Sequence, residues 1–595
     1  MKFRAITASL ELRTALHVGT GEGTETADDL LRRDARGRLM IPGTAIAGAL
    51  RSLATRLAPR LQDVGPCHAL KAKDLKNACG CLVCQLFGDV NPQEDVEKGG
   101  NAARVWVYDA VLDSSDVQLR DGVGIDRVTG AAARRERIKF DLEVLPAGTT
   151  FKLRIELDRH LQDTNALQLL AASLAEWEQG RGAVGGRVAR GLGAFALKGL
   201  QFIDHDLNNS SNLMQMLRSG PSWDRNDGDK TRLHTHVTAL RPKVTAWKDG
   251  EEAVARSWAL AEFTLMATGP FLTHDLTQAG RSGFDHAPLL DGYTKDSRPV
   301  LPGSSLRGVL RSQAERIART LATQAAWSES NPRQHFLDHC PACNPLTTKR
   351  DDPVASCNSF IKMLRKEDRS ELEKSGAEDK LCLACRLFGS TWNGSRLRAE
   401  DAPLKIGTTA EYKVLDFLAI DRFTGGGRDG AKFDAVVLWK PKFSVRLFLE
   451  NPEPWELGWL ALVLRDLNDG LATVGFGAAK GFGRCAIEEY KLTIGVLHDT
   501  DFPRPTSKNG NKALEQAIEA SERVVQAKGA DSGLYQTIAY DQVNQTDWLA
   551  LANGWVQEFS SEVQGHSRLH ERKNDSYFSE QGGHWLPDLY PARVP

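Results

Sequence analysis

The sequence predicts an α+β fold made of two copies of one domain. Stretches that alternate apolar and polar residues, as half-buried strands do, lie at 8–18 and 149–158, with counterparts at 259–269 and 442–450. Helical patterns are mixed with these stretches without a run of βαβ crossovers, which favours α+β over a doubly wound fold. Four motifs also occur twice in the same order, which indicates a duplicated domain.

The repeated motifs set the domain boundaries. They are RLMIPGTAIAGALR (38–51) and RPVLPGSSLRGVLR (298–311), CLVCQLFGD (81–89) and CLACRLFGS (382–390), GIDRVTG (124–130) and AIDRFTG (419–425), and VGGRVARGLGAF (184–195) and VGFGAAKGFGRC (474–485). The offset between partners runs from 260 residues (298 − 38) to 301 residues (382 − 81), as copies with different loop insertions would show. We therefore predict a first copy at 1–200, a linker at 201–256, a second copy at 257–497 and a C-terminal extension of unknown role at 498–595.

Each Pro-Gly turn is expected to open a helix. The apolar residues after each turn recur at steps of three or four, so that they share one helical face. They are Ile46, Leu50, Leu53 and Leu57 in the first copy and Leu306, Leu310, Ala314 and Ile317 in the second.

The composition is that of an ordinary globular protein. Charged residues make up 26% of the 595 residues and hydrophobic ones 41%, and the net charge is −1. This charge gives no overall attraction to nucleic acid or membrane, so a polyanion would need a local basic patch. Because no apolar run reaches about 18 residues and the chain opens as a strand, we expect a cytoplasmic protein that does not bind a membrane.

Cysteines form the strongest chemical signal. Thiols are kept reduced in the cytoplasm, so ten cysteines indicate metal binding more than disulfides. The first copy has four thiols within 18 residues, and the second has two C-x-x-C pairs, which is the spacing of a structural zinc site closed by four thiolates. The predicted ligands are Cys67, Cys79, Cys81 and Cys84 in the first copy and Cys340, Cys343, Cys382 and Cys385 in the second. Cys357 and His68 are alternative ligands, and free buried thiols are the alternative interpretation.

A carboxylate precedes each Pro-Gly turn in a polar loop. In both loops one acid lies six residues before another, and the earlier acid is Asp28 in the first copy and Asp285 in the second. By position alone, such a carboxylate more often caps a turn or faces solvent than takes part in catalysis. The neighbouring residues Asp29 and His286 leave the assignment within each loop open.

Basic residues gather beside an aromatic residue in each copy. Cations can contact RNA phosphates while a ring stacks on a base. The candidates are Arg127, Arg134, Arg135, Arg137 and Lys139 before Phe140, and Arg422, Arg428 and Lys432 before Phe433. The glycine-rich loops add Arg187, Arg190 and Lys480, where the backbone has room to approach phosphates. A solvated hairpin and a tight turn against a sheet are the alternative interpretations.

In their order, these four motifs resemble the RAMP superfamily, the guide-binding backbone subunits of type III CRISPR effector complexes. The resemblance covers both copies and leaves the linker and the extension unmatched. It implies two ferredoxin-like domains of the RNA-recognition type in tandem, each with a Cys-rich zinc knuckle and a thumb hairpin. The implied partners are a CRISPR RNA guide, complementary target RNA and other type III effector subunits.

The resemblance also assigns roles to residues. In the family, the thumb hairpin wedges into the duplex of guide and target and flips out a base. The matching segments contain Phe140 and Phe433, which are assigned to the wedge. Arg51 and Arg311, which end the turn-helix motifs, join the RNA-binding residues.

Family members that cut target RNA carry an aspartate in the loop before the Pro-Gly turn. That residue corresponds to Asp28 and Asp285, and Asp285 ranks higher because FDHAPLLD matches the cutting pattern better than ADDLLRRD does. The resemblance implies Mg²⁺-dependent cleavage at sites about six nucleotides apart, leaving 2′,3′-cyclic phosphate and 5′-OH ends.

Two other functions stay open. The chain could be a scaffold that holds RNA while another subunit cuts the target. It could also process the guide transcript, although that reaction would ordinarily need a catalytic histidine, which the matched motifs lack.

Overall fold

The computed structural model describes most of both copies. The described residues are 2–58, 81–89, 102–114, 116–126, 130–133, 139–158, 161, 165–220, 223, 257–292, 297–345, 354, 356–363, 381–497, 535–541 and 545–566. Within these residues, no helix is long and apolar enough to cross a membrane.

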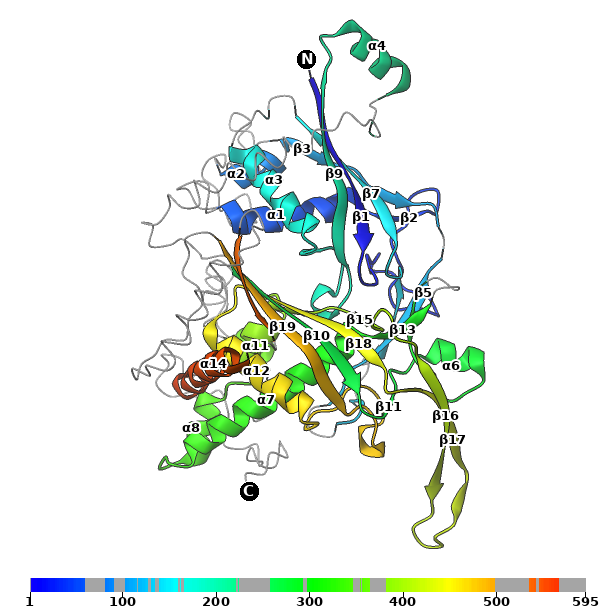
Figure 1. Ribbon diagram of the computed structural model, residues 1–595, viewed down its shortest axis with the longest axis vertical. Helices are drawn as coiled ribbons and strands as arrows, with labels where there is room; N and C mark the ends of the chain where they lie inside the picture. The colour runs from blue at the N-terminus through cyan, green and yellow to red at the C-terminus, as the bar shows by residue number, and fades with distance from the viewer. Residues whose placement is uncertain are drawn as a thin grey trace.

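The first copy is a five-stranded antiparallel sheet with helices packed on one face (Figure 1). The strand order is β3 (Val105–Val107), β7 (Thr150–Leu157), β1 (Lys2–Leu12), β9 (Ala194–Asp206) and β8 (Gly182–Ala183). The helices are α1 (Gly43–Leu57), α2 (Leu82–Phe87) and α3 (Asn165–Glu178), and α4 (Ser210–Ser219) follows β9. Strands β2 (Leu39–Ile41) and β4 (Ala110–Leu112) pair beside the sheet.

The second copy repeats this architecture. Its sheet has the order β14 (Leu397–Ala399), β18 (Lys442–Glu450), β10 (Ser257–Ala267), β19 (Cys485–Leu497) and β20 (Tyr535–Asp541). Its helices are α6 (Leu276–Ser282), α7 (Gly303–Ala326), α8 (Pro332–His339), α9 (Cys357–Met363), α11 (Leu383–Phe388), α12 (Pro454–Asn468) and α14 (Gln545–Gly565). Short strands β11 (Pro270–Phe271), β12 (Leu290–Asp291), β13 (Arg298–Leu301) and β15 (Ala402–Pro403) lie beside the sheet.

A shared irregularity shows how closely the copies agree. The pairing of β1 with β9 shifts register between Thr7 and Ser9, and the pairing of β10 with β19 shifts between Glu262 and Thr264. A bulge bends its strand and is a built-in feature of a fold. The prediction of an α+β protein with two tandem domains is therefore confirmed.

The Pro-Gly turns have a steric reason. Pro42 and Pro302 precede the first helical residue with φ near −60°, which the proline ring favours. A Cβ on Gly43 would lie 2.1 Å from the Val107 carbonyl oxygen, and one on Gly303 would lie 2.1 Å from that of Ala399. Only glycine allows the helix to begin this close to the edge strand.

The described part of the C-terminal extension packs onto the second copy. Strand β20 pairs with β19 over seven residues, from Leu497 opposite Tyr535 to Lys491 opposite Asp541. Helix α14 lies against α12, where the ring of Phe559 stacks on Trp459 with centroids 4.9 Å apart. The extension thus contributes a strand and a helix to the second domain.

The two copies share apolar contacts. Trp258, Phe448 and Tyr535 of the second half join the same buried cluster as the core of the first copy. The guanidinium group of Arg181 lies over Trp258 and Tyr535, 4.8 and 5.3 Å from the ring centroids.

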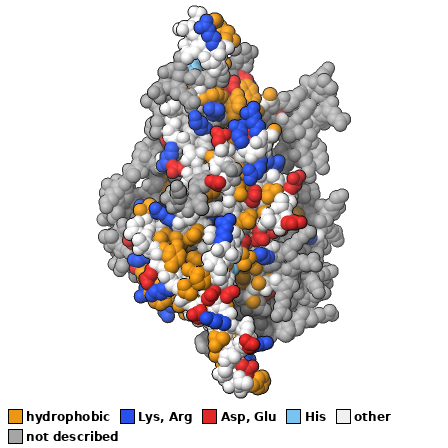
Figure 2. Space-filling model, turned by 90° about the vertical axis from the view of Figure 1, so that its right-hand side faces the viewer, with side chains coloured by type: hydrophobic (Ala, Val, Ile, Leu, Met, Phe, Trp, Pro, Cys, Tyr) orange, Lys and Arg blue, Asp and Glu red, His pale blue; other side chains and the backbone are white. Residues whose placement is uncertain are grey.

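Each copy carries a two-stranded hairpin where a thumb is expected. The first hairpin is β5 (Gln118–Val123) with β6 (Lys139–Val144), and the second is β16 (Glu411–Ile420) with β17 (Gly427–Trp439). The second hairpin projects from the body (Figure 1). On the face shown in Figure 2, Lys and Arg side chains gather on the upper half, above this hairpin.

Candidate functional site

The two candidate aspartates occupy matching positions at the bases of the hairpins. The Asp28 amide donates to the Asp141 carbonyl at 2.8 Å, and Asp28 Oδ2 accepts the Asp141 amide at 2.8 Å. In the second copy, Asp285 Oδ2 accepts the Asp434 amide at 3.0 Å, and the Asp285 amide donates to Asp434 Oδ1 at 2.9 Å. Both candidate side chains are exposed. The fold therefore fixes each carboxylate beside its hairpin and open to solvent.

The hairpin phenylalanines lie at the base and not at the tip. Phe433 stacks on Phe417 with centroids 4.8 Å apart and is half-buried. Phe140 is half-buried under the guanidinium group of Arg187, 3.9 Å from its centroid. The cross-strand register explains this, because Phe417 and Phe433 are directly opposite each other. The assignment of Phe140 and Phe433 to the base-flipping wedge stays a prediction, and Phe423, 99% exposed, is an apolar residue at the tip of the second hairpin.

The glycine-rich loops bring a cation to each hairpin base. Short 3₁₀ turns (Val188–Arg190 and Ala478–Lys480) follow residues with positive φ, at Arg187 in the first copy and Gly477 in the second. Lys480 Nζ lies 5.2 Å from the Phe433 centroid, as Arg187 lies over Phe140. Burial, with repulsion from Arg190, lowers the pKa of Arg187. Two motifs far apart in sequence thus meet at one site in each copy.

Of the other predicted RNA-binding residues, some belong to the described part of the chain and some lie outside it. All five described members are exposed: Arg190, Arg422, Arg428, Lys139 and Lys432. Two of them also form surface ion pairs, Lys139 with Asp141 at 3.6 Å and Lys432 with Asp416 at 3.3 Å. Four further predicted residues lie outside the described part of the chain: Arg127, Arg134, Arg135 and Arg137.

A histidine that sequence analysis missed lies close to each hairpin base. His17 Nε2 lies 3.1 Å from Asp29 Oδ2 in the first copy. In the second copy, the ring of His274 meets that of His286 edge-on, with centroids 4.6 Å apart. Burial, and to a lesser extent His286, lowers the pKa of His274. The signal available in the sequence was a constant spacing, because 17 and 274, 28 and 285, and 29 and 286 all differ by 257.

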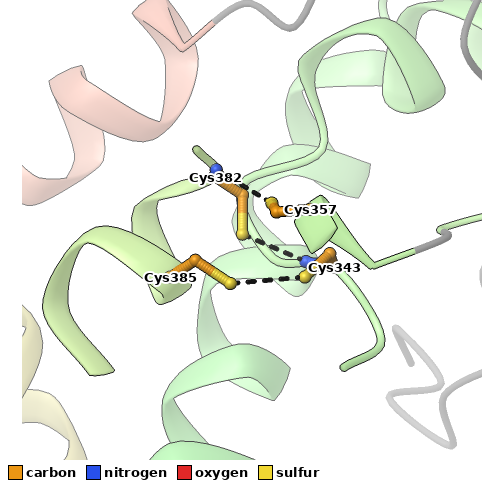
Figure 3. A group of neighbouring side chains, drawn as sticks. All are labelled: Cys343, Cys357, Cys382 and Cys385. Atoms are coloured by element: carbon orange, nitrogen blue, oxygen red, sulfur yellow. Dashed lines mark hydrogen bonds between the residues drawn. The ribbon is translucent and has the colours of Figure 1, made fainter. Parts of the chain in front are cut away.

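Four buried thiols meet in the second copy (Figure 3). They are Cys343, Cys357, Cys382 and Cys385, and their Sγ atoms all lie within 4.8 Å of one another. The Cys343 amide donates to Cys382 Sγ at 3.4 Å, and the Cys382 amide to Cys357 Sγ at 3.3 Å. Hydrogen bonds from the other thiols, together with burial, raise the pKa of Cys343 well above its usual value. Such a group fits a metal ion such as zinc, whose charge would allow the thiols to ionise.

The predicted ligand Cys340 is corrected to Cys357. Cys340 is not one of the four clustered thiols, and its Sγ lies 3.2 Å from the Ala342 carbonyl oxygen. Cys357 takes its place because it opens α9, which packs the thiol against the Cys382 amide. In the first copy, the described thiols Cys81 and Cys84 are buried, with the Cys84 amide 3.5 Å from Cys81 Sγ. Cys67, Cys79 and the alternative His68 lie outside the described residues.

The guanidinium groups of Arg51 and Arg311 reach the thiols of the two knuckles. Arg311 is 8% exposed; its Nη2 lies 3.6 Å from Cys385 Sγ, and its Nε donates to Glu315 at 2.7 Å. Burial lowers the pKa of Arg311, but attraction to Glu315 and Cys385 outweighs it, and the net shift is upward. Arg51 Nη2 lies 3.8 Å from Cys84 Sγ in the first copy. Arg311 is therefore buried beside the thiols and the half-buried Arg51 makes the matching contact, while the assignment of both residues to RNA binding stays a prediction.

We expect Arg311 to help retain a bound metal. The double variant Arg311→Met/Glu315→Gln removes the cation without leaving its buried carboxylate charged. Because groups that contact metal ligands tune affinity, metal affinity should fall by about 10–100-fold. Competition with a chromophoric chelator measures this, with the exposed Arg316→Met on the same helix as the control. Equal chelator half-points for both variants would contradict the expectation.

Comparisons with known proteins agree with the duplicated fold. A family model described as the RAMP superfamily matches residues 9–196 and 288–486. A relative from Methanocaldococcus jannaschii, named CRISPR system Cms endoribonuclease Csm3, is 25% identical over 206 residues, which cover 33% of this chain and 78% of the relative. A relative of the same name from Methanothermobacter thermautotrophicus is 26% identical over 225 residues, which cover 33% of this chain and 84% of the relative. Because the two regions that match the family fall one in each copy and together exceed half of the chain, the chain belongs to the RAMP superfamily and carries its domain twice.

Proposed function

We propose that this chain is a CRISPR RNA-binding backbone subunit of a type III effector complex and cleaves target RNA that pairs with the guide. One observation carries the proposal: in both copies the candidate aspartate is hydrogen-bonded to the backbone next to the hairpin phenylalanine. The name of the two relatives, which are called endoribonucleases of a CRISPR system, supports the same class of reaction.

Cleavage of this kind needs few protein groups, because the RNA supplies its own nucleophile. In RNA the 2′-oxygen attacks the adjacent phosphorus while the bond from phosphorus to the 5′-oxygen breaks. The leaving 5′-oxygen takes a proton from solvent, so the products are a 2′,3′-cyclic phosphate and a 5′-OH end. Asp28 or Asp285 would accept the proton of the 2′-OH, and the Asp141 or Asp434 amide holds the carboxylate in place. The hairpin would splay the target so that the attacking and leaving oxygens are in line. Two active copies would cut about six nucleotides apart, as the family resemblance implies.

The proposal includes two kinds of metal ion, zinc and magnesium. A structural zinc ion would occupy Cys343, Cys357, Cys382 and Cys385, and a second would occupy the first knuckle through Cys81 and Cys84. Mg²⁺ prefers oxygen ligands and keeps several waters, which fits an exposed carboxylate. In the alternative to the base role, Asp28 or Asp285 would hold this ion, which would stabilise negative charge that develops at the phosphate.

The partners follow from the exposed surface and from the family. Guide RNA and target RNA would contact the exposed cations Arg190, Arg422 and Arg428 and the cations at the hairpin bases, Arg187 and Lys480. Other type III effector subunits would complete the complex.

Target cleavage by the reconstituted complex tests the proposal. With guide RNA and Mg²⁺, we expect Asp28→Ala and Asp285→Ala each to slow one distinct cut by about 10²–10⁴-fold while target binding persists. The double variant should lose both cuts, and Asp116→Ala, an exposed aspartate before β5, serves as the control. An unchanged band pattern in the double variant would leave the chain a scaffold.

A further inference from the structure

The loop that carries Asp285 begins against the first copy. This segment, residues 276–291, is called the Asp285 loop; α6 opens it and β12 closes it. At its start, the Leu276 amide donates to Asp121 Oδ2 at 3.0 Å. Asp121 belongs to β5 of the first hairpin, which lies at the boundary between the copies (Figure 1). The first copy therefore supplies the hydrogen-bond acceptor for the first residue of α6.

The end of the Asp285 loop is held by a buried arginine of the same strand. Arg120 is 6% exposed and forms ion pairs with Asp291, at 3.7 Å, and with Asp401. Gln118, also on β5, donates to the Gly292 carbonyl at 2.5 Å. Burial lowers the pKa of Arg120, but attraction to the two carboxylates outweighs it and raises the pKa overall. The cation thus stays charged and keeps the end of the loop against β5.

The matching loop of the first copy is held differently. Asp34 matches Asp291, because both lie six residues after the candidate aspartate of their copy. Asp34 pairs with Arg38 of its own loop at 2.8 Å. Asp109 matches Asp401, because each accepts the amide of the glycine in its Pro-Gly turn, and Asp109 is exposed where Asp401 is buried. Asp291 and Asp401 therefore receive a cation from the other copy. Among the described residues, Asp34 and Asp109 receive none.

The second hairpin has a position equivalent to that of Arg120, but the residue there is not a cation. Asp121 pairs across its hairpin with Asp141, as Asp416 pairs with Asp434, so Arg120 and Leu415 occupy equivalent places one residue earlier. Leu415 packs in a small apolar cluster at its own hairpin base. The ion-pairing role of Arg120 therefore belongs to the first hairpin alone among the described residues.

We propose that Arg120 and Asp121 are positioning residues for the second candidate site. By holding both ends of the Asp285 loop, they fix where the Asp285 carboxylate stands beside the second hairpin. The second site is thus assembled across the boundary between the copies, within one polypeptide. The inference deepens the proposed cleavage function and rests on it only in its activity test.

The activity test uses the complete reconstituted complex. The two cuts are first assigned with Asp28→Ala and Asp285→Ala. In Arg120→Met, the Asp285-dependent cut should slow by about 10–100-fold at saturating target, because a small misplacement of a reacting group is costly. Asp291→Asn, which breaks the same contact from the second copy, should give the same loss, and Arg120→Lys should restore part of the rate. The Asp28-dependent cut in the Asp291→Asn lane is the internal reference.

The outcomes separate positioning from a general defect. Full Asp285-dependent rates in both variants would overturn the inference. Equal loss of both cuts in Asp291→Asn would also overturn it, because such a loss reports a defect of the whole chain.

Hydrogen exchange of the full chain without RNA gives a second, independent readout. Arg120→Met should speed amide exchange in peptides covering 276–291 and leave the peptides of the first loop, 19–34, unchanged. Leu415→Met, the same new residue at the equivalent place of the second hairpin, is the matched control. Unchanged amide exchange at 276–291 in Arg120→Met would contradict the inference that Arg120 holds the Asp285 loop. If the wild-type complex cuts no target, the proposed function fails, whereas the exchange result still decides this inference.

Discussion

Replacing Cys357 by alanine should remove the metal from the second copy, whereas replacing Cys340 should leave it bound. Cys357 is one of the four clustered thiols and Cys340 is not. In zinc peptides, structural zinc binds with about 10–16 kcal/mol of apparent free energy, which is comparable to the whole stability of a typical domain, about 5–15 kcal/mol. Cys357→Ala should therefore abolish cooperative unfolding of the second domain. Cys340→Ala should cost only about 1–3 kcal/mol, because it removes a buried sulfur and the contacts that it makes, including the one with the Ala342 carbonyl.

Two measurements check this pair of variants. Elemental analysis gives the zinc content of each purified chain, and thermal unfolding with and without a chelator gives the stability that depends on metal. Full zinc occupancy in Cys357→Ala, or loss of zinc in Cys340→Ala, would contradict the assignment of the ligands.

Gly303→Ala should destabilise the contact between the two copies, while Gly308→Ala in the same helix should be tolerated. A Cβ on Gly303 would lie 2.1 Å from the Ala399 carbonyl oxygen and 2.6 Å from the Gly191 Cα, and these backbone atoms cannot rotate away. Overpacking of this kind costs about 1–3 kcal/mol or more. Gly308 has nothing within 4 Å of an added Cβ, so alanine there should gain up to about 1 kcal/mol from helix propensity.

Chemical denaturation of the full chain compares the two alanine variants. The midpoint should fall for Gly303→Ala and stay equal or rise for Gly308→Ala. Equal midpoints for both variants would show that the first turn of α7 can move away from the edge strand at little cost.

Much of the fold could be predicted from short local patterns in the sequence. The Pro-Gly turns, the knuckles and the loop aspartates are short segments whose residues act on neighbours a few positions away, and each occurs twice. Because each segment occurs twice in the same order, the sequence predicts two tandem domains. The family resemblance, carried over by one shared spacing in two loops, pointed to Asp28 and Asp285, and both are hydrogen-bonded to the backbone of their hairpins.

The residues whose contacts the sequence did not predict are those with partners elsewhere in the chain. Arg311 ends a motif like a surface cation, but packing turns it toward Cys385, 74 residues away. Cys340 has the better local spacing, yet the fold of the intervening chain brings Cys357 to the other thiols. Phe433 is covered because it faces Phe417 across the hairpin.

The sequence by itself determined the duplication and the α+β class, because periodicity and repeated motifs are local properties that can be read from the order of residues alone. Only the tertiary structure decided which thiols meet, which arginines turn inward, and that Arg120 of the first copy holds the loop of the second through Asp291. The physical reason is that such contacts depend on how sheets and helices pack, and packing brings together residues that no spacing rule connects.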